Sequence, residues 1–258
     1  MIFDTHAHYD DKRFDCDREP FLASLPQKNV GLIVNPGCDG ETSRFAVSLA
    51  QQYGFIYAAV GWHPEEWESW DSQSMPLLRA LIKAPKVVAI GEIGLDYYWD
   101  RDHKDLQKEM FERQICLAIE NGLPVIVHDR EAHEDSLEMI LRYPEARGVF
   151  HCYSGSAEMA VELLRRGWYL GFDGPVTYKN NKKAAAVLAI TPLNRILVET
   201  DSPYMAPEPC RGQRNNSALL CHVLRHVAEA KGVSPEEMEK QTFKNGCELF
   251  GINEQSII

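Results

Sequence analysis

Two histidines one residue apart are the first side chains in the chain with clear metal-binding chemistry. His6 and His8 lie in the segment Asp-Thr-His-Ala-His, residues 4–8. In an extended strand, residues two apart project to the same side, so both imidazoles can reach one cation. The pair predicts a metal site where the first strand ends. The alternative interpretation is two polar residues at a strand end with no ligand.

Four more residues with ligand chemistry lie at the ends of apolar runs that are expected to be strands: Glu92 and His128 end their runs, His151 nearly ends its run, and Asp201 directly follows one. Taken singly, each has a plain alternative, because a buried histidine often satisfies a hydrogen bond and an acid at a strand end often caps the next helix. Together with the histidine pair they exceed the three ligands that one catalytic zinc usually takes from a protein. A carboxylate bridging two cations about 3.5–4 Å apart would use all of them. We therefore expect two divalent metal ions.

Eight short runs rich in Val, Ile and Ala alternate with helical stretches such as 104–121 and 156–166. The runs cover residues 2–5, 30–35, 56–60, 87–92, 124–128, 148–152, 168–173 and 195–200. Their near-continuous apolar content favours parallel strands buried on both faces. Eightfold strand–helix alternation predicts the α/β class and a (β/α)8 TIM barrel. In such barrels the active site lies at the carboxyl ends of the strands, where the six candidate ligands are expected.

The length and the lack of a long linker predict one domain over residues 1–258, an ordinary size for an α/β barrel. The Pro-rich segment 202–217 is expected to be an active-site loop. Two additional helices, 215–231 and 235–247, are expected to close the barrel. Ser234 would cap the second helix, with Pro235 at its first position.

Composition narrows the functional classes. The formal charge of −11 argues against a broad basic surface, so a nucleic-acid substrate would have to be held locally, at the metal site. Seven scattered cysteines without a Cys-x-x-Cys pair indicate reduced thiols. No membrane segment, secretory signal or obligate protein partner is evident, so we expect a cytoplasmic protein.

Other catalytic motifs are missing or incomplete. The chain lacks the Gly-x-Ser-x-Gly elbow of serine esterases and the Gly-x-x-x-x-Gly-Lys loop of P-loop ATPases. His222 and His226 have metalloprotease spacing, but Val223 stands where the general base should be. We interpret both as helix residues, and we expect His133 to be an exposed helix residue.

Five motifs, in order along nearly the whole chain, resemble the TatD family of metal-dependent deoxyribonucleases. They are Asp-x-His-x-His at 4–8, Gly-Glu-Ile-Gly-Leu-Asp-Tyr at 91–97, Pro-x-x-x-His-x-Arg at 124–130, His-Cys-Tyr-Ser-Gly-Ser at 151–156 and Glu-Thr-Asp-Ser-Pro-Tyr at 199–204. The resemblance implies an amidohydrolase-like barrel, a two-metal centre and phosphodiester hydrolysis. It also implies Mg²⁺ as the usual activating ion, with Zn²⁺ or Mn²⁺ sometimes bound.

The resemblance also assigns the ligands. It implies that His6 and His8 bind the first metal and that Glu92 bridges to the second. It further implies that His128 and His151 hold the second metal.

Catalytic and substrate-binding roles follow from the same resemblance. Asp201 would bind metal and the attacking water, taking its proton as general base, and Glu92 would share in catalysis through the metals. His63, in a Gly-x-His-Pro segment, and Arg130 would contact a substrate phosphate. The alternatives are that His63 packs on Trp62 or Trp67 and that Arg130 pairs with an acid such as Glu131.

Two further features stay open at this point. Trp62, Trp67, Trp70 and Trp99 could form either a stacking platform for a nucleobase or a hydrophobic lid. After Arg214 and Asn215, the chain has Asn216-Ser217 where the family usually has Glu-Pro, which leaves that loop and the start of the next helix undetermined.

We expect a hydrolase whose partner is a nucleic acid, most simply a 3'-5' exonuclease on single-stranded DNA, with RNA or transfer RNA as alternatives. A second hypothesis keeps the metals and changes the bond, giving an ester or amide hydrolase such as a D-aminoacyl-tRNA deacylase. The absence of a bridging lysine on the fourth strand, where Glu92 stands, weighs against small amides. A third hypothesis is a metal-binding scaffold that has lost catalysis.

Overall fold

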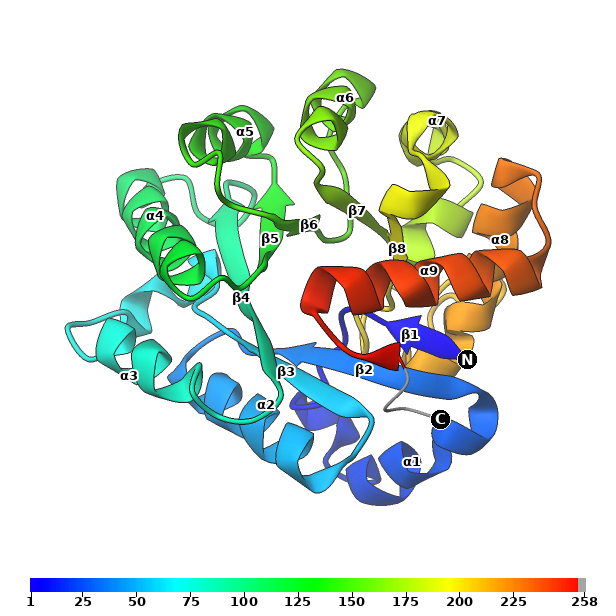
Figure 1. Ribbon diagram of the computed structural model, residues 1–258, viewed down its shortest axis with the longest axis horizontal. Coiled ribbons are helices and arrows are strands. Elements are labelled where there is room, and N and C mark those ends of the chain that lie inside the picture. Colours follow the sequence, from blue (N-terminus) through cyan, green and yellow to red (C-terminus); the bar gives the residue numbers. More distant parts are fainter. Residues whose placement is uncertain (255–258) are drawn as a thin grey trace.

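In the computed structural model, which describes residues 1–254, eight parallel strands follow one another around a single sheet (Figure 1). They are β1 Ile2–Asp4, β2 Val30–Pro36, β3 Ile56–Val60, β4 Val87–Asp96, β5 Val125–Arg130, β6 Gly148–Phe150, β7 Tyr169–Phe172 and β8 Ile196–Val198. The backbone joins the first and last strands just past their ends, where the Asp201 amide donates to the His6 carbonyl at 2.9 Å. The expected (β/α)8 barrel is confirmed.

The helices lie outside the strands, except for the last one, which runs across one end of the barrel (Figure 1). They are α1 Arg18–Ser24, α2 Gly40–Gln52, α3 Ser74–Leu81, α4 Lys104–Glu120, α5 His133–Arg142, α6 Ala157–Arg165, α7 Lys182–Ile190, α8 Leu220–Lys231 and α9 Pro235–Phe250. The expected helix at 215–231 begins only at Leu220, after a 3-10 turn over Ser217–Leu219. The predicted cap of α9 is present, because the Ser234 hydroxyl accepts the Glu237 amide. Residues 255–258 of the predicted domain lie outside the described residues.

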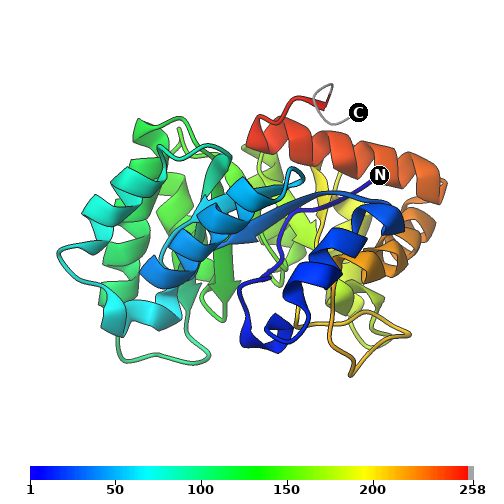
Figure 2. The ribbon, with the colours of Figure 1, turned by 90° about the horizontal axis from the view of Figure 1, so that it is seen from below.

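Helix α9 covers the amino end of the barrel. Figure 2 shows it at the end opposite the irregular segment 202–217. The Phe3 ring lies 5.9 Å, centroid to centroid, from the rings of both Phe243 and Phe250. The Asn245 side chain donates to the carbonyls of Leu193 and Ile196, each at 2.8 Å. A helix therefore covers this end of the barrel, opposite the carboxyl ends of the strands.

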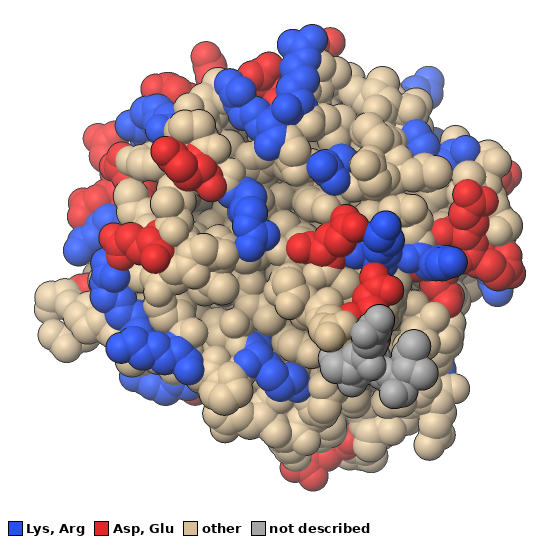
Figure 3. Space-filling model, viewed as in Figure 1, with Lys and Arg blue, Asp and Glu red and all other residues tan. Residues whose placement is uncertain are grey.

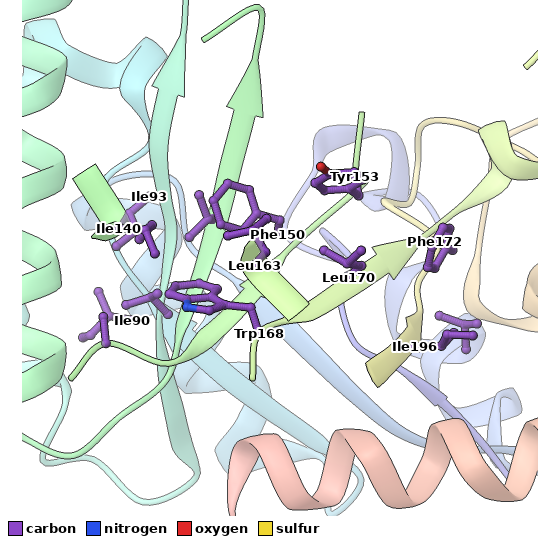
Figure 4. Close-up of a cluster of buried hydrophobic side chains, with 14 of the residues drawn as sticks. Ile90, Ile93, Ile140, Phe150, Tyr153, Leu163, Trp168, Leu170, Phe172 and Ile196 are labelled. Atoms are coloured by element: carbon purple, nitrogen blue, oxygen red, sulfur yellow. The ribbon is translucent and has the colours of Figure 1, made fainter. Parts of the chain in front are cut away.

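A second apolar layer fixes the strands against the surrounding helices (Figure 4). The Trp168 indole lies between strand residues such as Ile90 and Phe150 and helix residues such as Ile140 and Leu163, with all five side chains buried. Burying a side chain of this size contributes about 1.5–3 kcal/mol. The barrel is thus rigid enough to hold side chains at its rim in fixed positions.

Strand β4 departs from its expected bounds. It runs four residues past Glu92, to Asp96, and pairs there with the extended end of β5. Gly94 permits this close pairing: its φ is +149°, and a Cβ at this position would lie 1.9 Å from the His128 carbonyl oxygen. The expectation that Glu92 ends its strand is therefore wrong, and Glu92 lies within β4, where the register shifts between Ile90 and Ile93.

Surface charge is mixed on the face across which α9 runs. Figure 3 shows Lys and Arg side chains interspersed with Asp and Glu side chains there. This agrees with the expectation from net charge that no broad basic surface is present on this face. Within the described residues, no helix has the length and apolar character needed to cross a membrane.

We expect Gly246→Val to lower the free energy of unfolding by about 1–3 kcal/mol, because a Cβ at Gly246 would lie 2.5 Å from the Phe3 ring. Urea unfolding measures the change. Gly54→Ala is the matched control, since a Cβ there meets nothing within 4 Å. A Gly246→Val protein as stable as the native chain would contradict the described packing of α9.

Candidate metal centre

The structure brings all six predicted ligands to one place at the carboxyl ends of the strands. His6 and His8 follow β1, Glu92 and His128 lie within β4 and β5, and His151 and Asp201 follow β6 and β8. Five of them line an open cavity of about 1010 Å³, and the sixth, His6, lies fully buried beneath it. Residues from five strands therefore converge, although they are up to 195 positions apart in the sequence.

Glu92 divides the cluster into two groups of nitrogen donors. Its Oε2 lies 3.2 Å from His6 Nε2 and 3.4 Å from His8 Nε2. Its Oε1 lies 2.8 Å from both His128 Nδ1 and His151 Nε2. Each carboxylate oxygen thus faces its own pair of imidazoles, which is the arrangement needed to bridge two cations.

The spacing of the nitrogens fits shared cations. His6 Nε2 and His8 Nε2 are 3.0 Å apart, and His128 Nδ1 and His151 Nε2 are 3.3 Å apart. Two nitrogens bound to one ion at about 2.0–2.1 Å are separated by about 2.9–3.4 Å at octahedral or tetrahedral angles. Asp201 Oδ1 lies 3.6 Å from His8 Nε2 and adds an oxygen to the first group. The residues present therefore fit divalent metal ions.

Electrostatics keep the central carboxylate charged. Burial alone would raise the pKa of Glu92, but His151, His6 and His63 hold it well below its ordinary value. Burial, together with the neighbouring His151, lowers the pKa of His6 to about 3. Glu92 is therefore anionic and His6 is neutral, the protonation states in which these two side chains bind metals.

Asp96 contacts the candidate ligand His128, and the sequence analysis gave it no role. Its Oδ2 lies 2.9 Å from His128 Nε2, and its Oδ1 accepts the amides of Tyr98 and Trp99, both at 2.9 Å. The carboxylate thus fixes the ring so that Nδ1 faces Glu92. Spacing could have revealed it, because Asp96 lies four residues after Glu92 and even spacing along a strand selects one face.

Two more buried acids position the loops that carry the ligands. Glu199 accepts the amide of Cys152, directly after His151, and burial raises its pKa to about 8. Asp4 accepts hydrogen bonds from the hydroxyls of Thr200 and Ser217 at 2.7 and 2.6 Å. Both acids lie inside motifs recognised in the sequence, where they had no assigned role.

The departure at residues 216–217 is accommodated locally. The Asn216 side chain accepts the Ala218 amide and so caps the 3-10 turn before α8. The Ser217 hydroxyl donates to Asp4, and its amide donates to the Tyr9 hydroxyl at 3.0 Å. This loop is therefore tied to the segment that carries His6 and His8.

His63 lies beside the metal ligands. Its Nε2 is 3.4 Å from Glu92 Oε1, and its ring lies edge-on to that of His128 with centroids 4.3 Å apart. Trp62 packs instead on Trp70, and Trp67 stacks on the His103 ring. The alternative of a loop histidine packed on these tryptophans is therefore wrong.

Arg130 lines the cavity, and its guanidinium carbon lies 4.0 Å from the centroid of the Tyr98 ring. Glu131 pairs with Arg101 at 2.6 Å, so the alternative of an Arg130–Glu131 pair is wrong. Of the four tryptophans considered for stacking, only Trp99 lines the cavity, with 63% of its surface exposed.

The three histidines set aside in the sequence lie on helices away from this cluster. His222 and His226 are in α8. His133 begins α5 and is half-buried rather than exposed, because its ring lies 2.8 Å from an oxygen of Asp129.

Comparison with known proteins identifies the family. The model of TatD-related DNases matches residues 3–251. This chain belongs to the TatD family. A TatD relative in Bacillus subtilis, the uncharacterized metal-dependent hydrolase YabD, is 43% identical over 98% of this chain and 100% of its own length. The 3'-5' ssDNA/RNA exonuclease TatD of Cronobacter sakazakii is 34% identical over 96% of this chain and 97% of its own.

Solved structures agree with this assignment. The TatD homologue YjjV of Escherichia coli has a TM-score of 0.92 and 32% identity, covering 98% of each chain. A TatD-family hydrolase of Entamoeba histolytica, 21% identical, shares the fold with a TM-score of 0.85. The resemblance to TatD proteins and the expectation of a metal-dependent hydrolase are confirmed.

We expect Asp96→Asn to weaken binding of the cation held by His128 by about 10- to 100-fold, because the ring loses the carboxylate that orients it. Calorimetric titration with Mn²⁺ or Zn²⁺ measures the affinity. Asp100→Asn is the matched control, since Asp100 lies 2.8 Å from a nitrogen of His103, outside the site. Equal metal affinity in Asp96→Asn and the native protein would contradict this role.

Proposed function

We propose that this chain is a two-metal phosphodiesterase that removes nucleotides from the 3' end of single-stranded DNA. The observation that carries the proposal is the placement of Glu92, whose two oxygens face separate donor groups. A bridging carboxylate between two cations is the arrangement with which many nucleases and phosphatases displace an oxygen on phosphorus. The exonuclease name of a relative 34% identical to this chain supports the choice of substrate.

In this proposal the two groups of donors would hold two divalent ions. His6, His8 and Asp201 would bind the first, His128 and His151 would bind the second, and Glu92 would be shared by both. Bound there, the cations would lower the pKa of water and neutralise the phosphate oxygens. The donor set combines imidazoles with carboxylates, so Mn²⁺ and Zn²⁺ fit it, and Mg²⁺ remains our expected activating ion from the family resemblance.

Asp201 is the proposed general base. Its side chain is 17% exposed at the cavity, whereas the His6 side chain beside it is fully buried. A water entering the cavity therefore reaches Asp201 first and can pass its proton to the free carboxylate oxygen. The backbone holds the residue at a φ of +53°, with its amide bonded to the His6 carbonyl.

His63 and Arg130 are the proposed phosphate contacts. Both line the cavity beside the group that contains His128. The Arg130 guanidinium is planar and presents its N–H donors as a fixed fork, which suits a phosphodiester oxygen pair. A strand end entering the open cavity would meet these side chains beside the metal ligands.

We expect the purified chain to degrade 5'-labelled single-stranded DNA with Mg²⁺ or Mn²⁺ and to stop when EDTA is added. Asp201→Asn should lower kcat by about 10²–10⁴-fold, the usual contribution of a general base. His226→Ala, a histidine change on α8 outside the cluster, is the control and should retain full activity. Undiminished hydrolysis by Asp201→Asn would contradict the proposed mechanism.

The same assay decides polarity and bond type. A label at the 3' end should be released at once, whereas a strand labelled at its 5' end should shorten in steps of one nucleotide. Release of the amino acid from D-aminoacyl-tRNA, with DNA left intact, would replace the nuclease proposal with the deacylase hypothesis.

A further inference from the structure

Three arginines lie at the mouth of the cavity. Arg13, Arg130 and Arg211 line the cavity, and within residues 1–254 none of their guanidinium groups forms an ion pair, although the chain carries a formal charge of −11. Arginines just outside the mouth are paired, as in Arg18 with Asp15 and Arg101 with Glu131. Unpaired arginines in an acidic protein are available for an anionic ligand.

Each of the three arginines lies over the ring of a tyrosine. The guanidinium carbon is 4.4 Å, 4.0 Å and 4.3 Å from the ring centroid in the pairs Arg13–Tyr204, Arg130–Tyr98 and Arg211–Tyr178. Stacking fixes the plane of the guanidinium and leaves its edge, which carries the N–H donors, free. The edge can then bind two oxygens of one phosphate.

Two of the tyrosines are held in place by their hydroxyl groups. The Tyr204 hydroxyl donates to Asp11 at 2.8 Å, and the Tyr178 hydroxyl donates to the Ala206 carbonyl at 3.0 Å. Tyr204 and Tyr98 still expose 42% and 49% of their surface. Rigid, half-exposed rings beside cationic groups suit unpaired bases, whose faces are free to stack.

The pairs lie on two parts of the rim. Two involve the segment after β8, which reaches the loops after β1 and β7, and the third joins the ends of β4 and β5. Figure 2 shows the segment after β8 and the loop after β1 at the same end of the barrel, opposite α9. Acids line the cavity as well, Asp10 and Asp11 after β1 and Glu65 and Glu66 after β3. The three arginines are therefore the cationic points at which a polyanion that crosses the mouth can be held.

We propose that these three Arg–Tyr pairs form a rim that binds one single strand of a polynucleotide, with phosphates on the guanidinium groups and bases on the rings. The inference rests on the proposed function and deepens it. Such a rim would favour unpaired strands several nucleotides long over duplexes. It would also favour them over small phosphodiesters, because these reach the metal ligands without contacting the rim.

The test compares Arg13→Gln and Arg211→Gln with Arg195→Gln, a control from an Arg–Tyr pair at the closed end of the barrel, over Tyr169. The substrates are a DNA strand of about 12 nucleotides, within the usual length of single-strand sites, and bis(4-nitrophenyl) phosphate. Each rim variant should raise KM for the strand about tenfold, the effect of one charge-assisted hydrogen bond, with little change in kcat. The ratio of kcat/KM for the strand to kcat/KM for the small diester should therefore also fall about tenfold in each rim variant. In the Arg195→Gln control this ratio should equal that of the native protein.

Salt dependence separates a phosphate contact from a structural effect. Each lost contact should reduce the slope of log affinity against log salt by about 0.7. Tyr204→Ala should lower the affinity for the DNA strand because a stacking ring is lost, and Tyr204→Phe, which keeps the ring, should retain the native affinity. An unchanged KM and salt slope in the double variant Arg13→Gln/Arg211→Gln would overturn the proposal.

Binding tests the rim even if the proposed activity fails. A fluorescent phosphorothioate strand, which resists hydrolysis, is titrated with the Mg²⁺-loaded protein and followed by anisotropy. Tighter binding by the native protein and the Arg195→Gln control than by the rim variants supports the rim, even for a chain that hydrolyses no DNA. Equal binding by all four proteins refutes it.

Discussion

The buried charge of Glu92 is the constraint on which the rest of the site depends. Only 3% of this residue is exposed, and a carboxylate removed from water is very costly unless it is paired. The chain supplies imidazoles from the ends of β1, β5 and β6 around both of its oxygens. These contacts stabilise the charge, and a cation on each side would stabilise it further, so folding and metal binding favour the same arrangement.

The barrel provides this arrangement through rigid supports. Trp168 and its neighbours lock the strands to the outer helices, and α9 closes the opposite end. Near the site, buried acids take over the positioning: Asp96 orients His128, Glu199 holds the loop after His151, and Asp4 ties the segments after β1 and β8 together. Residues distant in sequence therefore meet with little freedom to move.

Sequence alone predicted the parts that depend on periodicity and residue type. The eight strands are buried on both faces, so each left a continuous apolar run, and the six candidate ligands stood close to the ends of those runs. It could not predict ring orientation or strand extension, and Asp96 was missed because β4 continues past Glu92 only through the close pairing at Gly94. The role of the tryptophans stayed open because it depends on the folded turn after β3, where Trp62 packs on Trp70 and Trp67 stacks on His103.

The most direct test of the central claim, that Glu92 bridges two metal ions, is anomalous diffraction from crystals soaked in Mn²⁺. The account predicts two peaks about 3.5–4 Å apart. One should lie beside His6 and His8, the other beside His128 and His151, each in contact with a different oxygen of Glu92. A single peak, or two peaks with Glu92 bound to neither ion or to only one, would contradict it.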